Sequence, residues 1–150
     1  MWLKCASIVV RVVILVFELL GIYADFSETM EETITKTEKA MRRSSVFQKA
    51  MREFLEAWEQ PGASNMTKGV AILNLIWNMN GEGFLTIIVQ SLCSKMTMWD
   101  YAKASVTVSA MTIAVFGSWG VALPVRLGLA ATSAVPLVKD INAVLRLCSL

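Results

Sequence analysis

Histidine is absent from the 150-residue sequence. The chain therefore lacks the usual acid or base of neutral pH, the usual partner of a nucleophilic serine or cysteine, and the commonest metal ligand. The three cysteines, Cys5, Cys93 and Cys148, are too far apart in the sequence to form a CxxC metal or redox motif. We expect no enzymatic activity, and no catalytic, cofactor-binding or metal-binding residues.

The sequence also lacks a large excess of charge of either sign. The formal net charge is +2, and the longest basic run is the pair Arg42 and Arg43. Such a chain attracts a phosphate backbone only weakly, so a nucleic-acid partner is not expected. Gly81 and Gly83 are not followed by the Lys-Ser or Lys-Thr pair of a phosphate loop, and we interpret them as a turn between helices.

Apolar residues, in contrast, make up 55% of the chain. An average soluble domain has roughly 45 to 50% even when glycine is counted, so the composition lies toward that of membrane-associated proteins. We predict an all-α fold, a helical bundle in which a charged amphipathic N-terminal layer surrounds a charge-poor C-terminal hairpin. Residues 25–150 are expected to form one domain, with charged amphipathic helices over 25–60 and an apolar helical core over 61–150.

Residues 1–24 have the order of a secretory signal. A basic start at Lys4 precedes an apolar run, and the small residue Ala24 precedes the polar Asp25. Arg11 and Glu18 interrupt the apolar region, and such charges oppose membrane insertion. We predict a cleaved signal peptide here. The alternatives are a retained signal anchor and a structural amphipathic helix, in which Arg11 and Glu18, seven residues apart, share one face.

Two further features favour export through the secretory pathway. Asn65 begins an Asn-Met-Thr glycosylation sequon just after the turn signal Pro61-Gly62. Removal of residues 1–24 would leave two cysteines, Cys93 and Cys148, which could form one disulfide bond. We therefore predict a glycoprotein with Asn65 as the acceptor and Cys93 and Cys148 as disulfide candidates.

The charged segment ends sharply at Pro61. Residues 25–60 contain eight acidic and six basic residues, whereas residues 61–150 contain three and six. Met30, Ile34 and Met41 recur at helical spacing and are expected to face the core. Helix start signals and apolar spacing predict four helices before residue 97: one capped by Ser27, one from Val46 to Glu59 opened by Ser45 and Gln48, one capped by Ser64, and one from Phe84 to Leu92.

The last third, from Thr97 to Leu147, is unusually apolar. Residues 104–125 carry no charge, and as a helix they would be about 33 Å long, enough to cross a hydrocarbon core of about 30 Å. Small residues and interfacial aromatic residues fit this interpretation. The two glycines of the segment 117–120 instead favour a helical hairpin. The residues of this membrane or core hairpin are Trp99, Tyr101, Ala110, Ala114, Gly117, Trp119 and Gly120.

In architecture alone, a charged layer followed by a charge-poor hairpin is similar to the pore-forming domains of colicin-type bacteriocins, and no residue motif accompanies the similarity. We predict a non-enzymatic, secreted or membrane-associated helical protein. It would act through apolar helix surfaces on a lipid bilayer or a protein partner, with membrane insertion as one version. The alternatives are an integral membrane protein with one or more spans between Ala104 and Val138, and a purely structural or interaction bundle.

Overall fold

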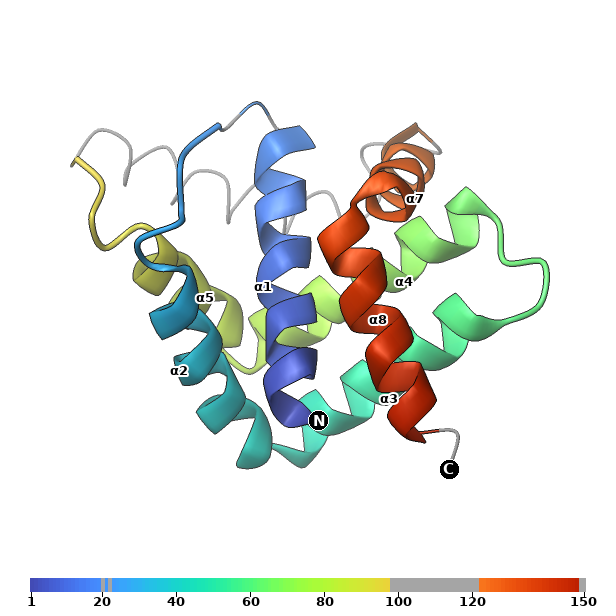
Figure 1. Cartoon of the computed structure of the whole chain (residues 1–150), viewed down its shortest axis with the longest axis horizontal. Helices are drawn as coiled ribbons and strands as arrows, with labels where there is room; N and C mark the ends of the chain where they lie inside the picture. Colours follow the sequence, from blue (N-terminus) through green and yellow to red (C-terminus); the bar gives the residue numbers. More distant parts are fainter. Residues whose placement is uncertain (20, 22, 98–121, 149–150) are drawn as a thin grey trace.

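The computed structural model describes residues 1–19, 21, 23–97 and 122–148 (Figure 1). Within these ranges the chain forms seven α-helices and no strand, which confirms the predicted all-α bundle. The helices are α1 (Trp2–Leu19), α2 (Met30–Arg42), α3 (Ser45–Glu59), α4 (Asn65–Gly81), α5 (Phe84–Leu92), α7 (Ala122–Ser133) and α8 (Val135–Cys148).

Helix α1 lies in the middle of the bundle, between α2 and α8 (Figure 1), and it also contacts α7. Its side chains Ile8, Val13 and Phe17 are completely buried. The segment interpreted as a signal peptide thus occupies the position that the alternative, a structural amphipathic helix, requires. Cleavage after Ala24 stays a prediction, but it would remove much of the core described below.

The core joins α1 to apolar side chains of all the other described helices. The stripe predicted for the third helix is buried as expected, with Phe54 and Trp58 in tilted ring contact. Phe47, from the same helix, stacks on Phe84 at the start of α5, with 4.8 Å between ring centroids. Aromatic pairs of this kind contribute beyond their buried area, and this one fixes the α2–α3 corner against the α4–α5 turn.

Two of the predicted helix starts are confirmed with their caps, and one of them is shifted by a residue. The Ser64 hydroxyl accepts a hydrogen bond from the Thr67 amide at 3.1 Å. For α3 the cap is Ser44, not Ser45, because the Ser44 hydroxyl accepts from the Phe47 amide at 3.1 Å. Gln48 does not close a capping box; its side-chain amide donates to the Met41 carbonyl at 3.0 Å and ties α3 to the end of α2.

The expected cap Ser27 does not begin a helix. Helix α2 starts later, at Met30, and its N-cap Thr29 makes no side-chain capping bond. The Ser27 amide instead donates to the Asp25 carboxylate at 2.9 Å, in a short turn before the helix. This hydrogen bond favours the charged carboxylate and lowers the pKa of Asp25 below its ordinary value of 3.8.

Helices α4 and α7 cross with their backbones in direct contact. A Cβ atom on Gly69 would overlap the backbone carbonyl of Pro124, and one on Gly128 would overlap that of Asn65. Gly69 is one turn after Asn65 in α4, and Gly128 is one turn after Pro124 in α7. The two contacts are therefore reciprocal, and the two helices are antiparallel. Only residues without a side chain permit this approach.

Helix α2 packs on α5 through hydroxyl groups. Thr33 and Ser91 share a hydrogen bond of 2.8 Å between their side-chain oxygens, and the Thr29 hydroxyl donates to the Leu92 carbonyl at 2.8 Å. The Thr37 hydroxyl donates to the Thr33 carbonyl, also at 2.8 Å. Four hydroxyl-bearing residues of this contact are buried. We call them the hydroxyl seam: Thr29, Thr33, Thr37 and Ser91. Because each buried hydroxyl has a partner, the seam avoids the cost of unsatisfied polar groups.

The hydroxyl seam predicts a specific double-mutant cycle. Thr33→Val removes one hydroxyl and leaves that of Ser91 buried without its partner, so the free energy of unfolding should fall by about 1 to 3 kcal/mol. Adding Ser91→Ala removes the orphaned group and should restore part of the loss. Urea unfolding of the three variants measures the coupling. Thr35→Val, at an exposed position of the same helix, is the control and should change stability by less than about 0.5 kcal/mol. If the loss of stability in the double variant equalled the sum of the losses in the two single variants, the prediction would be contradicted.

Across the described ranges, no single helix is both long and apolar enough to cross a membrane. Helices α4 and α5 meet that requirement only as a pair, and the pair is bent by 97° at their junction. The bend comes at Gly83, whose φ of +78° is a left-handed conformation that glycine adopts without strain.

Candidate binding groove along helix α1

One face of α1 is not covered by its neighbours. Lys4, Ser7, Arg11, Ile14 and Glu18 follow one another at intervals of three or four residues, so they form a single stripe along the helix. Every residue of this stripe is partly or fully exposed, whereas ten other residues of α1 are buried. Helix α1 lies between α2 and α8 (Figure 1), and the residues of the stripe line pockets together with residues of both helices. The stripe forms the floor of a groove, and the two flanking helices form its walls.

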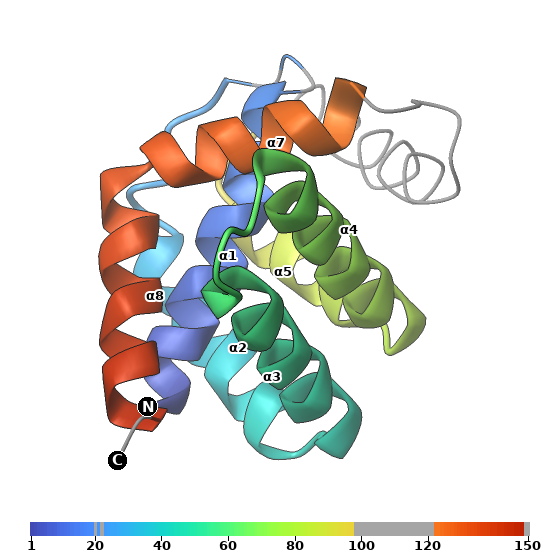
Figure 2. The same cartoon turned by 90° about the vertical axis from the view of Figure 1, so that its right-hand side faces the viewer.

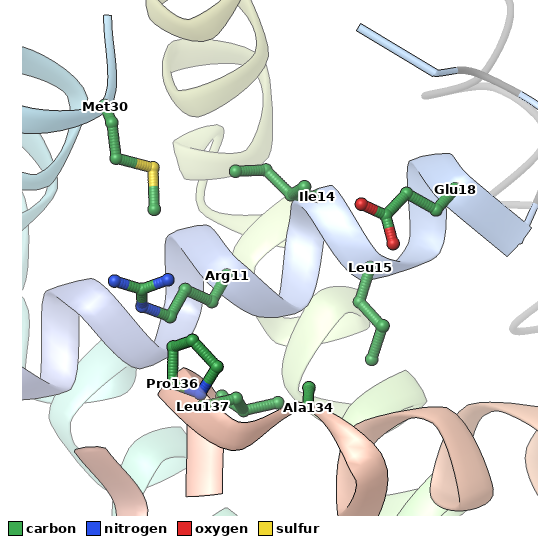
Figure 3. Close-up of a pocket in the computed structure, with 8 residues that line it drawn as sticks. All are labelled: Arg11, Ile14, Leu15, Glu18, Met30, Ala134, Pro136 and Leu137. Atoms are coloured by element: carbon green, nitrogen blue, oxygen red, sulfur yellow. The ribbon is translucent and has the colours of Figure 1, made fainter. Parts of the chain in front are cut away.

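Two adjoining pockets make up this groove, and Met30 of α2 lines both of them. The first has a volume of about 160 Å³ and is shown in Figure 3, where Arg11 extends from α1 between Met30 and Pro136 of α8. The second has a volume of about 440 Å³ and lies toward the start of α1, where Leu3 and Ile34 contribute apolar surface. We call the two together the α1 groove.

A polar cluster joins the floor to one wall in the middle of the α1 groove. One carboxylate oxygen of Asp140, on α8, accepts from the Ser7 hydroxyl at 2.7 Å and from the Arg11 guanidinium at 3.2 Å. Arg11 also donates to the Ser7 hydroxyl at 3.3 Å. The Asp140 side chain is only 19% exposed, so water screens this pair less than it would a surface pair. The cluster fixes the position of α8 along α1.

The walls of the groove are mainly apolar, and its rims carry charge. Met41 is buried in the core, as the apolar spacing predicted. Met30 and Ile34 pack against the core as well, but they are only partly buried and their exposed parts line the groove. Glu18 and Glu31 stand at its edges, and neither forms an ion pair with another described residue. With Arg11 neutralised by Asp140, the remaining charges are these two carboxylates and Lys4, so the groove is slightly acidic.

Two of the residues proposed from the sequence, Asn65 and Cys93, do not line the α1 groove. Asn65 is the first residue of α4 and is partly buried beside α7, rather than at the tip of an exposed loop. Cys93 is buried, and no two cysteines of the described part of the chain lie at disulfide distance. The side chain of Cys148 is outside the described residues. So are all seven residues of the predicted hairpin: Trp99, Tyr101, Ala110, Ala114, Gly117, Trp119 and Gly120.

Only part of the α1 groove is predictable from the sequence. The spacing of Arg11 and Glu18 predicts that they share one face of a helix, and they do. The contact between Arg11 and Asp140 is not predictable, because the two residues are 129 positions apart in the chain and no local pattern marks them as partners. Only the antiparallel packing of α1 and α8 brings the two together.

The α1 groove combines apolar side chains with the polar cluster of Ser7, Arg11 and Asp140. Among the residues that the structure describes, no group of three or more His, Cys, Asp or Glu side chains could hold a metal ion. Comparison with family models, with curated proteins and with solved structures gives no match for this chain.

Proposed function

We propose that this chain is a non-enzymatic helical protein that binds an amphipathic helix of a protein partner in the α1 groove. The observation that carries the proposal is the partly exposed stripe of α1, which lies at the floor of a groove with apolar walls. The α1 groove is thus the apolar helix surface through which the protein would act.

The dimensions of the groove fit a short helix. Lys4 and Glu18, at the two ends of the floor, are fourteen residues apart in α1, which corresponds to about 21 Å, or four helical turns. Helices that bind in grooves are anchored by apolar residues spaced three, four and seven apart. Met30, Ile34 and Pro136 offer apolar contacts for such anchors on the walls.

The charges favour a basic partner. Glu18 and Glu31 at the rims can each pair with a lysine or arginine that flanks the apolar face of the bound helix. Rim pairs of this type contribute modestly to affinity and more to the rate of association and to specificity. A helix with acidic flanks would face two unpaired carboxylates and is expected to bind more weakly.

A synthetic peptide provides the test. A peptide of about 16 residues with leucines at helical spacing and lysines on its other faces should bind the full chain with a dissociation constant on the order of micromolar, measured by fluorescence anisotropy. Ile34→Gln replaces an apolar wall residue by a polar one and should weaken binding by roughly tenfold, the equivalent of about 1.4 kcal/mol. Thermal unfolding followed by circular dichroism checks that the variant folds.

Two controls make the test specific. Ile87→Gln changes the same residue type at an exposed position of α5, which does not line the groove, and should leave the affinity unchanged. A peptide with glutamates in place of the lysines should bind less tightly. Equal losses for the two isoleucine variants, or equal affinities for the two peptides, would reject the α1 groove as the binding site.

Membrane insertion is the second candidate function. The bent pair of α4 and α5 favours it, because the two helices together have the length and composition of a span. In this version the protein is secreted or membrane-associated, and a lipid bilayer replaces the protein partner. Spans between Ala104 and Val138, in an integral membrane protein, are the alternative arrangement.

A further inference from the structure

Three chain segments lie at one end of the bundle. The first turn of α1, the corner between α2 and α3, and the last turn of α8 are all at the lower end in both views (Figures 1 and 2). Figure 2 shows the α2–α3 corner on one side of this end and the start of α1 with the end of α8 on the other. The antiparallel packing of α1 and α8 brings the start of one beside the end of the other. We call this region the basic end, for the charges described next.

The basic end gathers cations that the fold leaves unpaired. Lys39 and Arg43 belong to the last turn and the C-cap of α2, Lys4 to the first turn of α1, and Arg146 to the last turn of α8. None of these four side chains forms an ion pair with another described residue. Arg42 is different, because it pairs with Glu38 at 2.7 Å.

Four acidic residues border these cations. Glu82 lines a shallow pocket together with Arg43, and Glu31 and Asp140 line a pocket together with Lys4. Glu38 and Asp140 are already paired with Arg42 and Arg11, so the four unpaired cations outnumber the two unpaired carboxylates. The acidic residues Glu18, Asp25, Glu28 and Glu32 are in the last turn of α1, the linker and the first turn of α2. These segments lie farther up the bundle (Figure 1).

Large apolar side chains are exposed among these cations. Leu3 of α1 is 53% exposed, Val46 of α3 is 45% exposed, and Leu147 of α8 is 50% exposed. Exposed apolar residues scattered singly need no explanation. These three residues, however, lie at one end of the bundle and in the same segments as the unpaired cations. Together with the cations they form a mixed basic and apolar surface.

We propose that the basic end docks on an anionic membrane surface. Lipid headgroups of negative charge attract clustered lysines and arginines, and apolar side chains beside them enter the boundary of the acyl chains. The stems of lysine and arginine are themselves apolar and tolerate this boundary. Nucleic acid would also attract the cations, but it would gain nothing from Leu3, Val46 and Leu147. The docked protein would lie on the membrane without spanning it.

Vesicle sedimentation with the full chain tests the proposal. Vesicles containing about 30% phosphatidylserine should carry the protein down in low salt, and vesicles of phosphatidylcholine alone should not. Because each basic side chain near an anionic surface contributes roughly fivefold to binding, Lys39→Gln with Arg43→Gln should weaken it about 30-fold. Raising the ionic strength should release the bound protein, since it shortens the range of the attraction.

Matched controls lie at the other end of the bundle. Lys95→Gln with Arg126→Gln removes the same charge from exposed positions after α5 and in α7, and should leave binding unchanged. Leu147→Ser should weaken binding several-fold by removing an apolar contact, whereas Leu129→Ser, at a leucine of α7 that is 56% exposed, should not. Circular dichroism confirms that the variants remain folded.

Four outcomes would overturn the proposal: equal binding to neutral and anionic vesicles, no binding to either, an equal loss in the control variants, or retention of the bound protein through alkaline carbonate extraction. The last of these would indicate an integral protein. Binding to a short DNA duplex with no binding to vesicles would assign the basic end to nucleic acid instead.

Discussion

A chain that begins at Asp25 is expected not to fold into the bundle. Helix α1 contributes eight buried valine, leucine, isoleucine or phenylalanine side chains to the core. Burying a side chain of this size stabilises a protein by about 1.5 to 3 kcal/mol, so their loss removes roughly 12 to 24 kcal/mol. This loss is as large as or larger than the roughly 5 to 15 kcal/mol of net stability that is typical of a domain. The remaining helices would also expose the apolar faces that cover α1.

Circular dichroism and urea unfolding of residues 25–150, beside the full chain, measure this effect. The truncated chain should lose its cooperative transition and bind a dye specific for exposed apolar surface. Phe17→Ala in the full chain is a milder change and should cost about 3 to 5 kcal/mol, with Glu18→Ala, at the exposed neighbouring position, as its control. A truncated chain that unfolds cooperatively at the same urea concentration would show that residues 1–24 are dispensable, as a cleaved signal peptide requires.

The second large effect is expected where α4 and α7 cross. Alanine inside a helix is usually more favourable than glycine by about 1 kcal/mol. At Gly69 or Gly128 we expect alanine to lower the free energy of unfolding instead, because the added methyl group overlaps a backbone carbonyl of the facing helix. A backbone cannot relieve this overlap by a change of rotamer, as a side chain could. Overpacking of a core usually costs about 1 to 3 kcal/mol. Each substitution should therefore lower the melting temperature by several degrees.

Gly81→Ala is the matched control for this prediction. Gly81 ends the same helix as Gly69, has no positive φ, and would place its Cβ in open space. The substitution should be neutral or raise stability by up to about 1 kcal/mol. Differential scanning calorimetry of the three variants distinguishes these signs. If Gly69→Ala proved as stable as Gly81→Ala, the close crossing of α4 and α7 would be wrong.

The helices that the sequence predicted best are those with local start signals. Ser64 opens α4 as expected, and Phe84 to Leu92 forms α5 with the predicted bounds. These features depend on a few neighbouring residues, so a pattern of caps and apolar spacing is enough to find them. Ser27 misled the prediction because a serine hydroxyl and amide serve equally in short turns outside helices, and Asp25 supplies such a turn.

The parts that the sequence did not predict depend on packing between distant segments. Residues 1–24 look like an export signal because both a signal and a buried core helix need a long apolar run. The placement of α1 at the centre appears only once α2, α7 and α8 are packed around it. The same holds for the α1 groove, whose polar cluster joins Arg11 to Asp140, and for the glycines of α4 and α7, which no local pattern marks as facing each other.

The hydroxyl seam has a consequence for how the bundle moves. Two of the three residues that α2 buries are threonines. Thr33 and the N-cap Thr29 meet α5 by hydrogen bonds instead of by large apolar side chains. A local opening of the interface between α2 and α5 would therefore expose mostly groups that water can solvate, with a small change in heat capacity and a weak dependence on denaturant. Helix α2 would separate as its own cooperative unit before the rest of the bundle unfolds. Because α2 is also one wall of the α1 groove, such an opening would widen the groove while the core on the other faces of α1 stayed intact.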